Sequence, residues 1–357
     1  MKMVKIFILF FFTTLVAFQL VKGESVEIGV YQLKNDKISV KLTNLGATVL
    51  SILVPDKHGR REDIVLGYDS VDAYFEDSSY FGSIVGRVAN RIGHARFKLD
   101  GTLYRLVANE GKNTLNGGSR GFNRVVWRVR NYEQSPVPRV TFIYHSRDGE
   151  QGFPGDIIVT ITYTLTDLGL SVAIKAIAKN KPTPVNLAQH IYWNLGGHDS
   201  GNILSHKVQI NGSHITPVDR HLIPTGKIVH AEGTPYDFLR PHAIKSRIKK
   251  LRGGYNINYV LNGKGNKLEQ AAKLYDKKSG RVLEIFTTAP CLQLYTGDDL
   301  KNVKGKGGQV YKRNAGLVLA TQGYPDAVNH PNFPSQIVEK RRPYKHYVLY
   351  KFSTTDA

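Results

Sequence analysis

The sequence predicts an all-β protein built as one large antiparallel β-sandwich. Apolar and polar residues alternate strictly over long stretches, most clearly between residues 157 and 178. Candidate helices are few and short. No Pro-, Gly- or Ser-rich linker and no internal repeat divides the chain after its first 23 residues, so we expect residues 24–357 to form a single domain.

The first 23 residues predict a secretory signal peptide. Two early lysines precede an apolar run from Ile6 to Leu20, and Gly23 lies near the expected cleavage site. The run is shorter than the roughly 20 residues that a membrane span needs. We therefore expect no membrane span, and a protein of the secretory pathway that ends in the extracellular space, the apoplast or the vacuole.

Strands are predicted along the rest of the chain by the same alternation. The stretch 157–178 is predicted to be a hairpin with one buried face, because its alternation is interrupted only by "DLG" at 167–169. The best helical candidate is "SVDAYFED" at 70–77. The further predicted strands lie within 37–55, 139–146, 267–276, 281–288 and 347–353.

The chain is strongly basic, with 49 Lys and Arg against 29 Asp and Glu. Removing three leader lysines leaves 46 basic residues and a net charge of +17. Secretion and the lack of any nucleic-acid-binding motif argue against a nucleic-acid partner. The densest basic stretches, 245–252, 301–313 and 339–347, are interpreted first as solvated surface. The alternative is attraction to acidic wall polysaccharide or to an anionic membrane surface.

Cysteine usage and one glycosylation motif complete the composition. Cys291 is the only cysteine, so a secreted chain would have no internal disulfide, and the size of the core must supply its stability. Whether this thiol is reactive is left open. Asn211 begins the sequon "NGS" and is predicted to carry a glycan if the chain enters the secretory route.

Seven motifs are too specific to be ordinary turns. They are "GSIVGRVANRIGHARFKLDG" (82–101), "ANEGKNTLNGGSRGFNRVVW" (108–127), "VNLAQHIYWNLGGH" (185–198), "GTPYDF" (233–238), "GGYNINYVL" (253–261), "LQLYTG" (292–297) and "GLVLATQGYPDAVNHPNFPSQIV" (316–338). In this order they resemble the aldose 1-epimerases, or galactose mutarotases, especially plant members. The resemblance covers essentially the whole chain after the leader and implies a large β-sandwich.

The resemblance also implies a chemistry. Mutarotation needs a base that removes the anomeric hydroxyl proton and an acid that protonates the ring oxygen, so that the ring opens and closes on the other face. Similar proteins use a glutamate in "LETQ" as the base, one histidine in "LHGG" and a second in "NLxxHxYxNL". An aspartate in "GYD", an Asn-Arg pair and a glutamine hold the sugar.

Half of these positions are retained in this sequence. Asn90 and Arg91 match the Asn-Arg pair, His190 matches the second histidine, and Gln293 matches the glutamine. We expect His190 to be the catalytic residue. It is also expected to be a neutral base, because a nearby negative charge is missing and Arg91, if close, disfavours the imidazolium form.

The other half is changed. Ala320 stands where the resemblance places the glutamate base, Asn116 replaces the first histidine, and Asn256 replaces the aspartate. Alanine cannot accept a proton, and a neutral amide is no base at ordinary pH. Asn116 and Asn256 are predicted to bind the ligand together with the retained polar residues, and all of these positions are expected to line one cavity.

Three functions remain open from the sequence. The first is a diverged isomerase or cyclase that uses His190 on a less polar hemiacetal, lactol or enolisable carbonyl compound. The second is a secreted carbohydrate-binding protein without catalysis, and the third is a weakly active aldose 1-epimerase. No cofactor is predicted, and no metal site, because the histidines near the motifs lack metal-ligand spacing.

Overall fold

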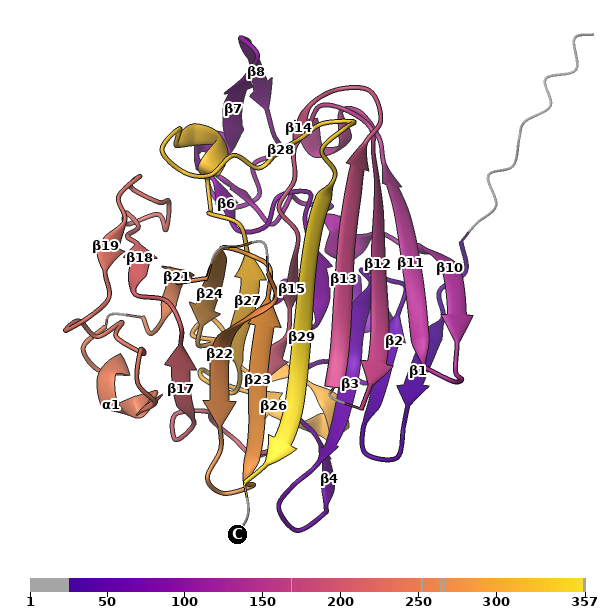
Figure 1. Ribbon diagram of the computed structural model, residues 1–357, viewed down its shortest axis with the longest axis vertical. Coiled ribbons are helices and arrows are strands. Elements are labelled where there is room, and N and C mark those ends of the chain that lie inside the picture. Colours follow the sequence, from indigo (N-terminus) through magenta and orange to yellow (C-terminus); the bar gives the residue numbers. More distant parts are fainter. Residues whose placement is uncertain (1–25, 168, 252, 264, 266, 356–357) are drawn as a thin grey trace, which may run out of the picture.

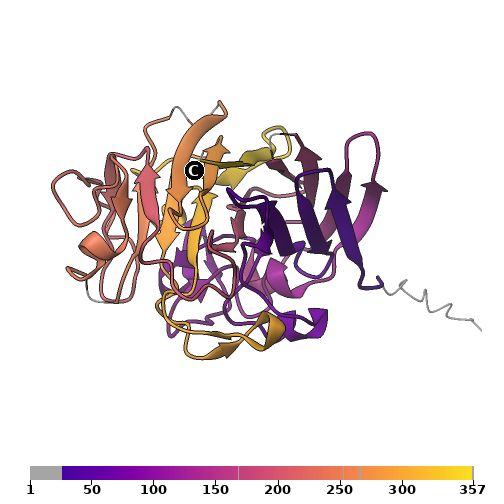
Figure 2. The ribbon, with the colours of Figure 1, turned by 90° about the horizontal axis from the view of Figure 1, so that it is seen from below.

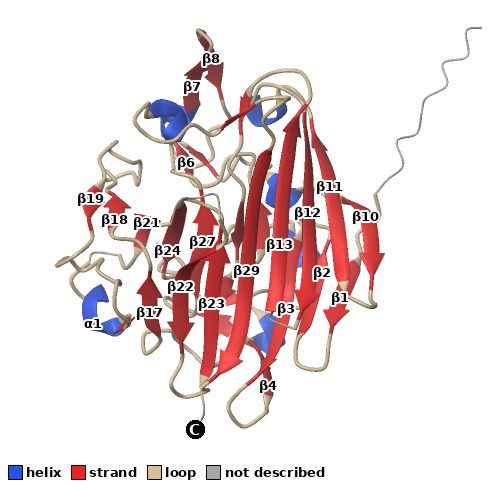
Figure 3. Cartoon of the chain, viewed as in Figure 1, coloured by secondary structure: helices blue, strands red, loops and turns tan. Residues whose placement is uncertain are grey.

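The computed structural model describes residues 26–355 except residues 168, 252, 264 and 266. The predicted leader at 1–23 lies outside the described residues. Strands dominate the described chain, as Figure 3 shows. The longest of them lie side by side in one broad antiparallel sheet (Figure 1).

This broad sheet has nine strands, and long-range pairing builds most of it. The last long strand of the chain inserts between the central hairpin and a later hairpin. In spatial order the strands are β10 (Arg128–Glu133), β11 (Arg139–Ser146), β12 (Ile157–Thr166), β13 (Gly169–Ala178), β29 (Tyr344–Thr354), β23 (Arg281–Thr287), β22 (Glu269–Tyr275), β17 (Lys207–Ile210) and β20 (His242–Ala243).

The predicted central hairpin is confirmed. β12 pairs with β13 in antiparallel register from Ile157 opposite Ala178 to Thr166 opposite Gly169. Along β12 every second residue from Ile157 to Leu165 is buried, and the residues between them, Ile158 and the threonines, are partly exposed. The alternation therefore indicates a strand with one face packed on the core and the other face toward solvent.

Two smaller sheets pack against the broad one. The first contains β1 (Val30–Lys34), β2 (Ser39–Thr43), β3 (Thr48–Pro55) and β4 (Arg61–Asp63). The second contains β16 (Tyr192–Trp193), β27 (Leu317–Gln322), β24 (Cys291–Tyr295), β21 (Asn256–Val260), β18 (His214–Thr216) and β19 (Val229–His230).

One hydrophobic core joins these sheets. It includes Val40 of β2, Ile161 of β12, Val348 of β29 and Leu319 of β27, each almost fully buried. The view from below shows the smaller sheets stacked against the broad one (Figure 2). The predicted antiparallel β-sandwich is thus confirmed, because apolar faces of several sheets meet in a single core.

Short strand pairs and single-turn helices connect the sheets. The pairs are β5 (Ser83–Val85) with β15 (Ala188–His190), β6 (Arg91–Ile92) with β9 (Thr114–Leu115), β7 (Arg96–Leu99) with β8 (Thr102–Arg105), β14 (Thr183–Pro184) with β28 (Ile337–Val338), and β25 (Val303–Lys304) with β26 (Val310–Tyr311). The helices are η1 (Val71–Tyr74), η2 (Gly93–Ala95), η3 (Phe122–Arg124), η4 (Glu150–Gly152), η5 (Lys306–Gly308), η6 (Ala327–Asn329) and α1 (Lys245–Ile248).

The helix expected at 70–77 is only partly present. Its first half forms the 3₁₀ turn η1, which Ser70 caps by accepting a hydrogen bond from the main-chain N–H of Asp72. The chain then leaves the helical path, because the carboxylate of Asp77 accepts hydrogen bonds from the N–H groups of Ser79 and Phe81. Such local bonds offer the backbone an alternative to a longer helix. None of the described helices is long and apolar enough to cross a membrane.

Cys291 and Asn211 both lie on strands or at their ends. Cys291 is fully buried on β24, and burial raises the pKa of its thiol well above its usual value. The thiol is therefore protonated and shielded, which makes it a packing residue in the folded chain. The side-chain nitrogen of Asn211, to which a glycan would be attached, donates a hydrogen bond to the carbonyl of Gln270 at 2.8 Å.

Three largely buried histidines are expected to make stability depend on pH. Burial lowers the pKa of His190, of His206 and of His346 from 6.5 to about 4. His206 is held neutral by the N–H of Leu195, which donates to its Nε2 at 3.0 Å. Between pH 4 and 6.5 the unfolded chain therefore binds protons that the folded chain does not. The free energy of unfolding should fall as the pH drops through this range, by on the order of 3 kcal/mol per histidine.

Urea unfolding at pH 7.5, 6 and 5 measures this effect. The His346→Gln variant should show a shallower loss of stability with falling pH, since one of the three histidines is gone. Equal or greater stability of the unaltered chain at pH 5 would contradict the expectation.

Candidate active site

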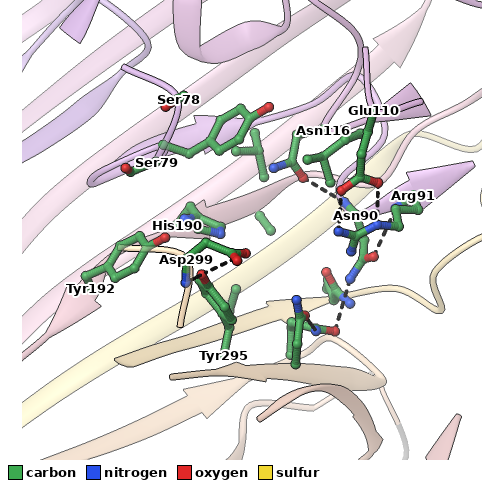
Figure 4. Close-up of a pocket in the computed structure, with 18 of the residues that line it drawn as sticks. Ser78, Ser79, Asn90, Arg91, Glu110, Asn116, His190, Tyr192, Tyr295 and Asp299 are labelled. Carbon is green, nitrogen blue, oxygen red and sulfur yellow. Dashed lines mark hydrogen bonds and ion pairs between the residues drawn. The ribbon is translucent and has the colours of Figure 1, made fainter. Parts of the chain in front are cut away.

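A cavity of about 200 Å³ opens where β6, β9 and β15 meet the strands β21, β24 and β27. Segments distant in sequence line it, so only the sandwich topology gathers them. All seven positions singled out in the sequence line this one cavity: Asn90, Arg91, Asn116, His190, Asn256, Gln293 and Ala320. Figure 4 labels the first four of them.

Strand register places three of these residues on the cavity floor. Gln293 of β24 lies directly opposite Ala320 of β27. On its other side β24 pairs with β21, with Asn256 opposite Tyr295. Side chains two apart in a strand share a face, so Tyr295 and Gln322 also point into the cavity, which both residues line.

Amide side chains form a connected row along the floor and one wall. The Nδ2 of Asn90 donates to the Oε1 of Gln293 at 3.0 Å, and the Nε2 of Gln293 donates to the Oδ1 of Asn256 at 2.7 Å. The Oδ1 of Asn116 accepts from the main-chain N–H of Asn90 at 2.9 Å. Asn90 and Asn116 both have left-handed backbone, with φ of 62° and 50°, which asparagine tolerates better than most residues. Asn116 therefore positions Asn90.

Arg91 is not a free cation. Its Nε and one terminal nitrogen donate to the two carboxylate oxygens of Glu110, each at 2.6 Å (Figure 4). Such a two-pronged pair fixes both side chains and cancels their charges locally. The bond joins β6 to the loop before β9.

His190 ends β15, which pairs with β5 so that His190 lies opposite Ser83. Its ring meets Tyr80 and Tyr192 edge-on, with centroid distances of 5.8 and 5.4 Å. The Nδ1 has no hydrogen-bond partner among the described residues. The ring is partly exposed at the cavity, and its burial among the surrounding side chains lowers its pKa from 6.5 to about 4.

The neutral imidazole agrees with the sequence-based expectation, but its cause is different. The sequence attributes the neutral form to the absence of a glutamate and the nearness of Arg91. Burial is the principal cause instead, and Arg91 is already paired with Glu110. A neutral imidazole carries one ring nitrogen with a free lone pair, and this nitrogen can accept a proton.

Comparison with known proteins shows to which family this chain belongs. The sequence model of the family described as aldose 1-epimerase matches residues 29–351. The chain belongs to the aldose 1-epimerase family. It is 41% identical to the galactose mutarotase of Bos taurus over 325 residues, which cover 90% of this chain and 93% of that protein.

More distant family members agree with this assignment. The aldose 1-epimerase of Escherichia coli is 34% identical over 307 residues, covering 84% of this chain and 87% of that protein. Among solved structures, an aldose epimerase homologue from C. elegans superposes with a TM-score of 0.86 at 29% identity. It covers 92% of this chain and 100% of its own.

The structure adds cavity residues that the sequence did not single out. Glu110 and Asp299 supply two carboxylates, and Tyr80, Tyr192 and Tyr295 supply aromatic walls. Glu110 lies inside a quoted motif and Asp299 two residues after another. No sequence signal, however, shows that Glu110 meets Arg91 or that Asp299 bonds to Tyr295 at the cavity.

The chemistry open to this site is limited by its proton acceptors. Ala320 presents a methyl group that is 2% exposed, and the amides beside it cannot take a proton near neutral pH. The cavity side chains that carry a basic atom and form no ion pair are His190 and Asp299. Among the described residues no group of three or more His, Cys, Asp or Glu side chains could hold a metal ion.

Proposed function

We propose that this chain opens and closes a cyclic hemiacetal that carries fewer hydroxyl groups than an aldose, with His190 as its proton-transfer group. The proposal rests mainly on one observation, the presence of alanine at position 320. In this proposal its methyl group occupies the place of the family's glutamate base, at the centre of the cavity floor. Asn116 and Asn256 likewise replace an acid–base histidine and a sugar-binding carboxylate.

The proposed reaction needs only one relaying group. His190 takes the proton from the anomeric hydroxyl, the C1–O bond becomes a carbonyl, and the ring C–O bond breaks. The imidazolium then gives its proton to the ring oxygen that has been released, so protons and electrons balance. Because the pKa of His190 is about 4, this second transfer is strongly favourable.

The walls support a ligand of low polarity. Val85, Leu115, Ala188 and Leu300 line the cavity beside Ala320. Hydrogen bonds to sugar hydroxyls are strongest when the protein group is charged. The polar floor of this cavity instead consists of neutral amides that are already bonded to one another. A ring with few hydroxyls leaves fewer polar groups unpaired in such a site.

Tetrahydropyran-2-ol, a cyclic hemiacetal without further hydroxyls, provides a direct test. Exchange spectroscopy by NMR measures its interconversion with the open aldehyde. We expect the protein to accelerate this exchange, and to accelerate it more than the mutarotation of D-galactose. Absence of acceleration, or a clear preference for galactose, would overturn the proposal.

Aldose mutarotation itself is the second candidate. It is supported by 41% identity to a protein named galactose mutarotase and by the carboxylate of Asp299 at the cavity. Asp299 would then act as a base in place of the missing glutamate. In that case Asp299→Asn should abolish galactose mutarotation, whereas Glu76→Gln, on an exposed residue outside the cavity, should not.

We also propose that the chain is secreted and that its leader, residues 1–23, is removed. The support is the leader pattern and the high positive charge, which suits an acidic wall polysaccharide. N-terminal sequencing of protein from a secreting host should begin at Glu24. Retention of Met1 in secreted protein would contradict the proposed cleavage.

A further inference from the structure

One end of the cavity holds a carboxylate that the proposed proton relay does not use. Asp299 lines the cavity next to Tyr295, and in Figure 4 it is drawn apart from the Arg91–Glu110 pair. The hydroxyl of Tyr295 donates to its Oδ2 at 3.3 Å and accepts from its main-chain N–H at 2.9 Å. These bonds hold the residue at the cavity while its side chain stays exposed.

This carboxylate gives the cavity a net negative charge. Arg91 is the only arginine or lysine among the described residues that line it, and Glu110 neutralises it. His190 is neutral, and no cation of the described chain lies within salt-bridge distance of Asp299. Although the whole chain has a net charge of +20, the carboxylate of Asp299 at this cavity has no cationic partner among the described residues.

Aromatic rings surround the same end. Tyr80, His190, Tyr192 and Tyr295 form a continuous series with centroid distances of 5.8, 5.4 and 6.0 Å. Tyr80 and Tyr295 are partly exposed at the cavity, and Tyr192 is buried behind them. Rings of this kind, together with a carboxylate, attract organic cations, because the ring faces are negative and the ammonium group is easily desolvated.

We propose that the ligand of this cavity is an organic cation, a protonated or quaternary amine whose nitrogen lies against Asp299 and Tyr295. The part of the ligand that reacts at His190 rests on the proposed function, whereas the cation site rests on Asp299 and the tyrosines. The amine end and the hemiacetal end of one ligand would then occupy neighbouring parts of the cavity.

The test compares two ligands of the same shape by isothermal titration calorimetry. Choline carries a trimethylammonium group, and 3,3-dimethylbutan-1-ol replaces its nitrogen with carbon. We expect choline to bind at least about tenfold more tightly, because a carboxylate and aromatic rings together attract its positive charge. The positive charge of the whole chain repels choline elsewhere, so a preference for it reports a local site.

Three variants locate the site. Asp299→Asn should remove the preference for choline, and Tyr295→Leu should weaken choline binding while Tyr295→Phe, which keeps the ring, retains most of it. The matched control Glu76→Gln removes one exposed carboxylate outside the cavity and should leave the preference unchanged. Equal affinity for the two ligands, or a preference that survives Asp299→Asn, would overturn the proposal.

The two proposals fail separately. Choline has no hemiacetal, so its binding does not depend on turnover. Tetrahydropyran-2-ol has no charge, so its exchange does not depend on a cation site. Loss of either result leaves the other standing.

Discussion

A variant that carries Ala320→Glu, Asn116→His and Asn256→Asp together is expected to mutarotate D-galactose at least about a hundred times faster than the unaltered chain. One well-placed acid or base accelerates a reaction about 10²- to 10⁴-fold. Catalytic groups that act as a unit give their full acceleration only when all of them are present. Position 320 lies opposite Gln293 on the cavity floor, so a glutamate there would face the ligand.

The backbone around these positions is suited to the change. Asn116 has a left-handed φ of 50°, and histidine is among the residues that adopt this region more readily. Its imidazole could accept the main-chain hydrogen bond that Asn116 now accepts from Asn90. The cavity of about 200 Å³ leaves room for a glutamate side chain in place of a methyl group.

Polarimetry on freshly dissolved α-D-galactose measures this gain. The matched control carries Ala320→Gln with the same two other changes, so it has the size of the glutamate without its charge. Circular dichroism establishes that both variants fold. An equal gain in the glutamine control, or none in a folded glutamate variant, would show that position 320 does not govern the chemistry.

His190→Ala is expected to lower the rate of tetrahydropyran-2-ol exchange by about 100-fold or more, because it removes the group that relays the proton. His221→Ala, the same substitution at an exposed histidine outside the cavity, should leave the rate unchanged. A rate that survives His190→Ala would make His190 structural and the relay wrong.

The pH profile of that rate separates a catalytic from a structural role. Burial lowers the pKa of His190 to about 4, so the base stays neutral down to about pH 5. The rate should be flat from pH 7 to 5 and should fall as the pH passes through 4. A fall centred near 6.5 would indicate an imidazole in contact with water.

The fold could be predicted from the sequence because alternation is a local signal. The burial of alternate residues along β12 follows directly from its sequence. The helix at 70–77 was overestimated, because the sequence did not show that the Asp77 side chain binds the backbone of Ser79 and Phe81.

The sequence predicted which residues line the cavity, but not which of them form hydrogen bonds with one another. The ordered motifs indicated which residues share a cavity. That Asn90 bonds to Gln293, 203 positions away, or that Glu110 takes both nitrogens of Arg91, depends on tertiary packing. The same holds for the neutral state of His190, since burial, its main cause, is a property of the folded chain.

The central claim is that the cavity floor no longer carries the base for sugar mutarotation. Polarimetry of the unaltered chain on fresh α-D-galactose, beside the galactose mutarotase of Bos taurus at equal concentration, tests it most directly. We predict a rate below about one hundredth of that relative's, as the loss of even one acid or base group implies. A rate comparable to the relative's would contradict the claim.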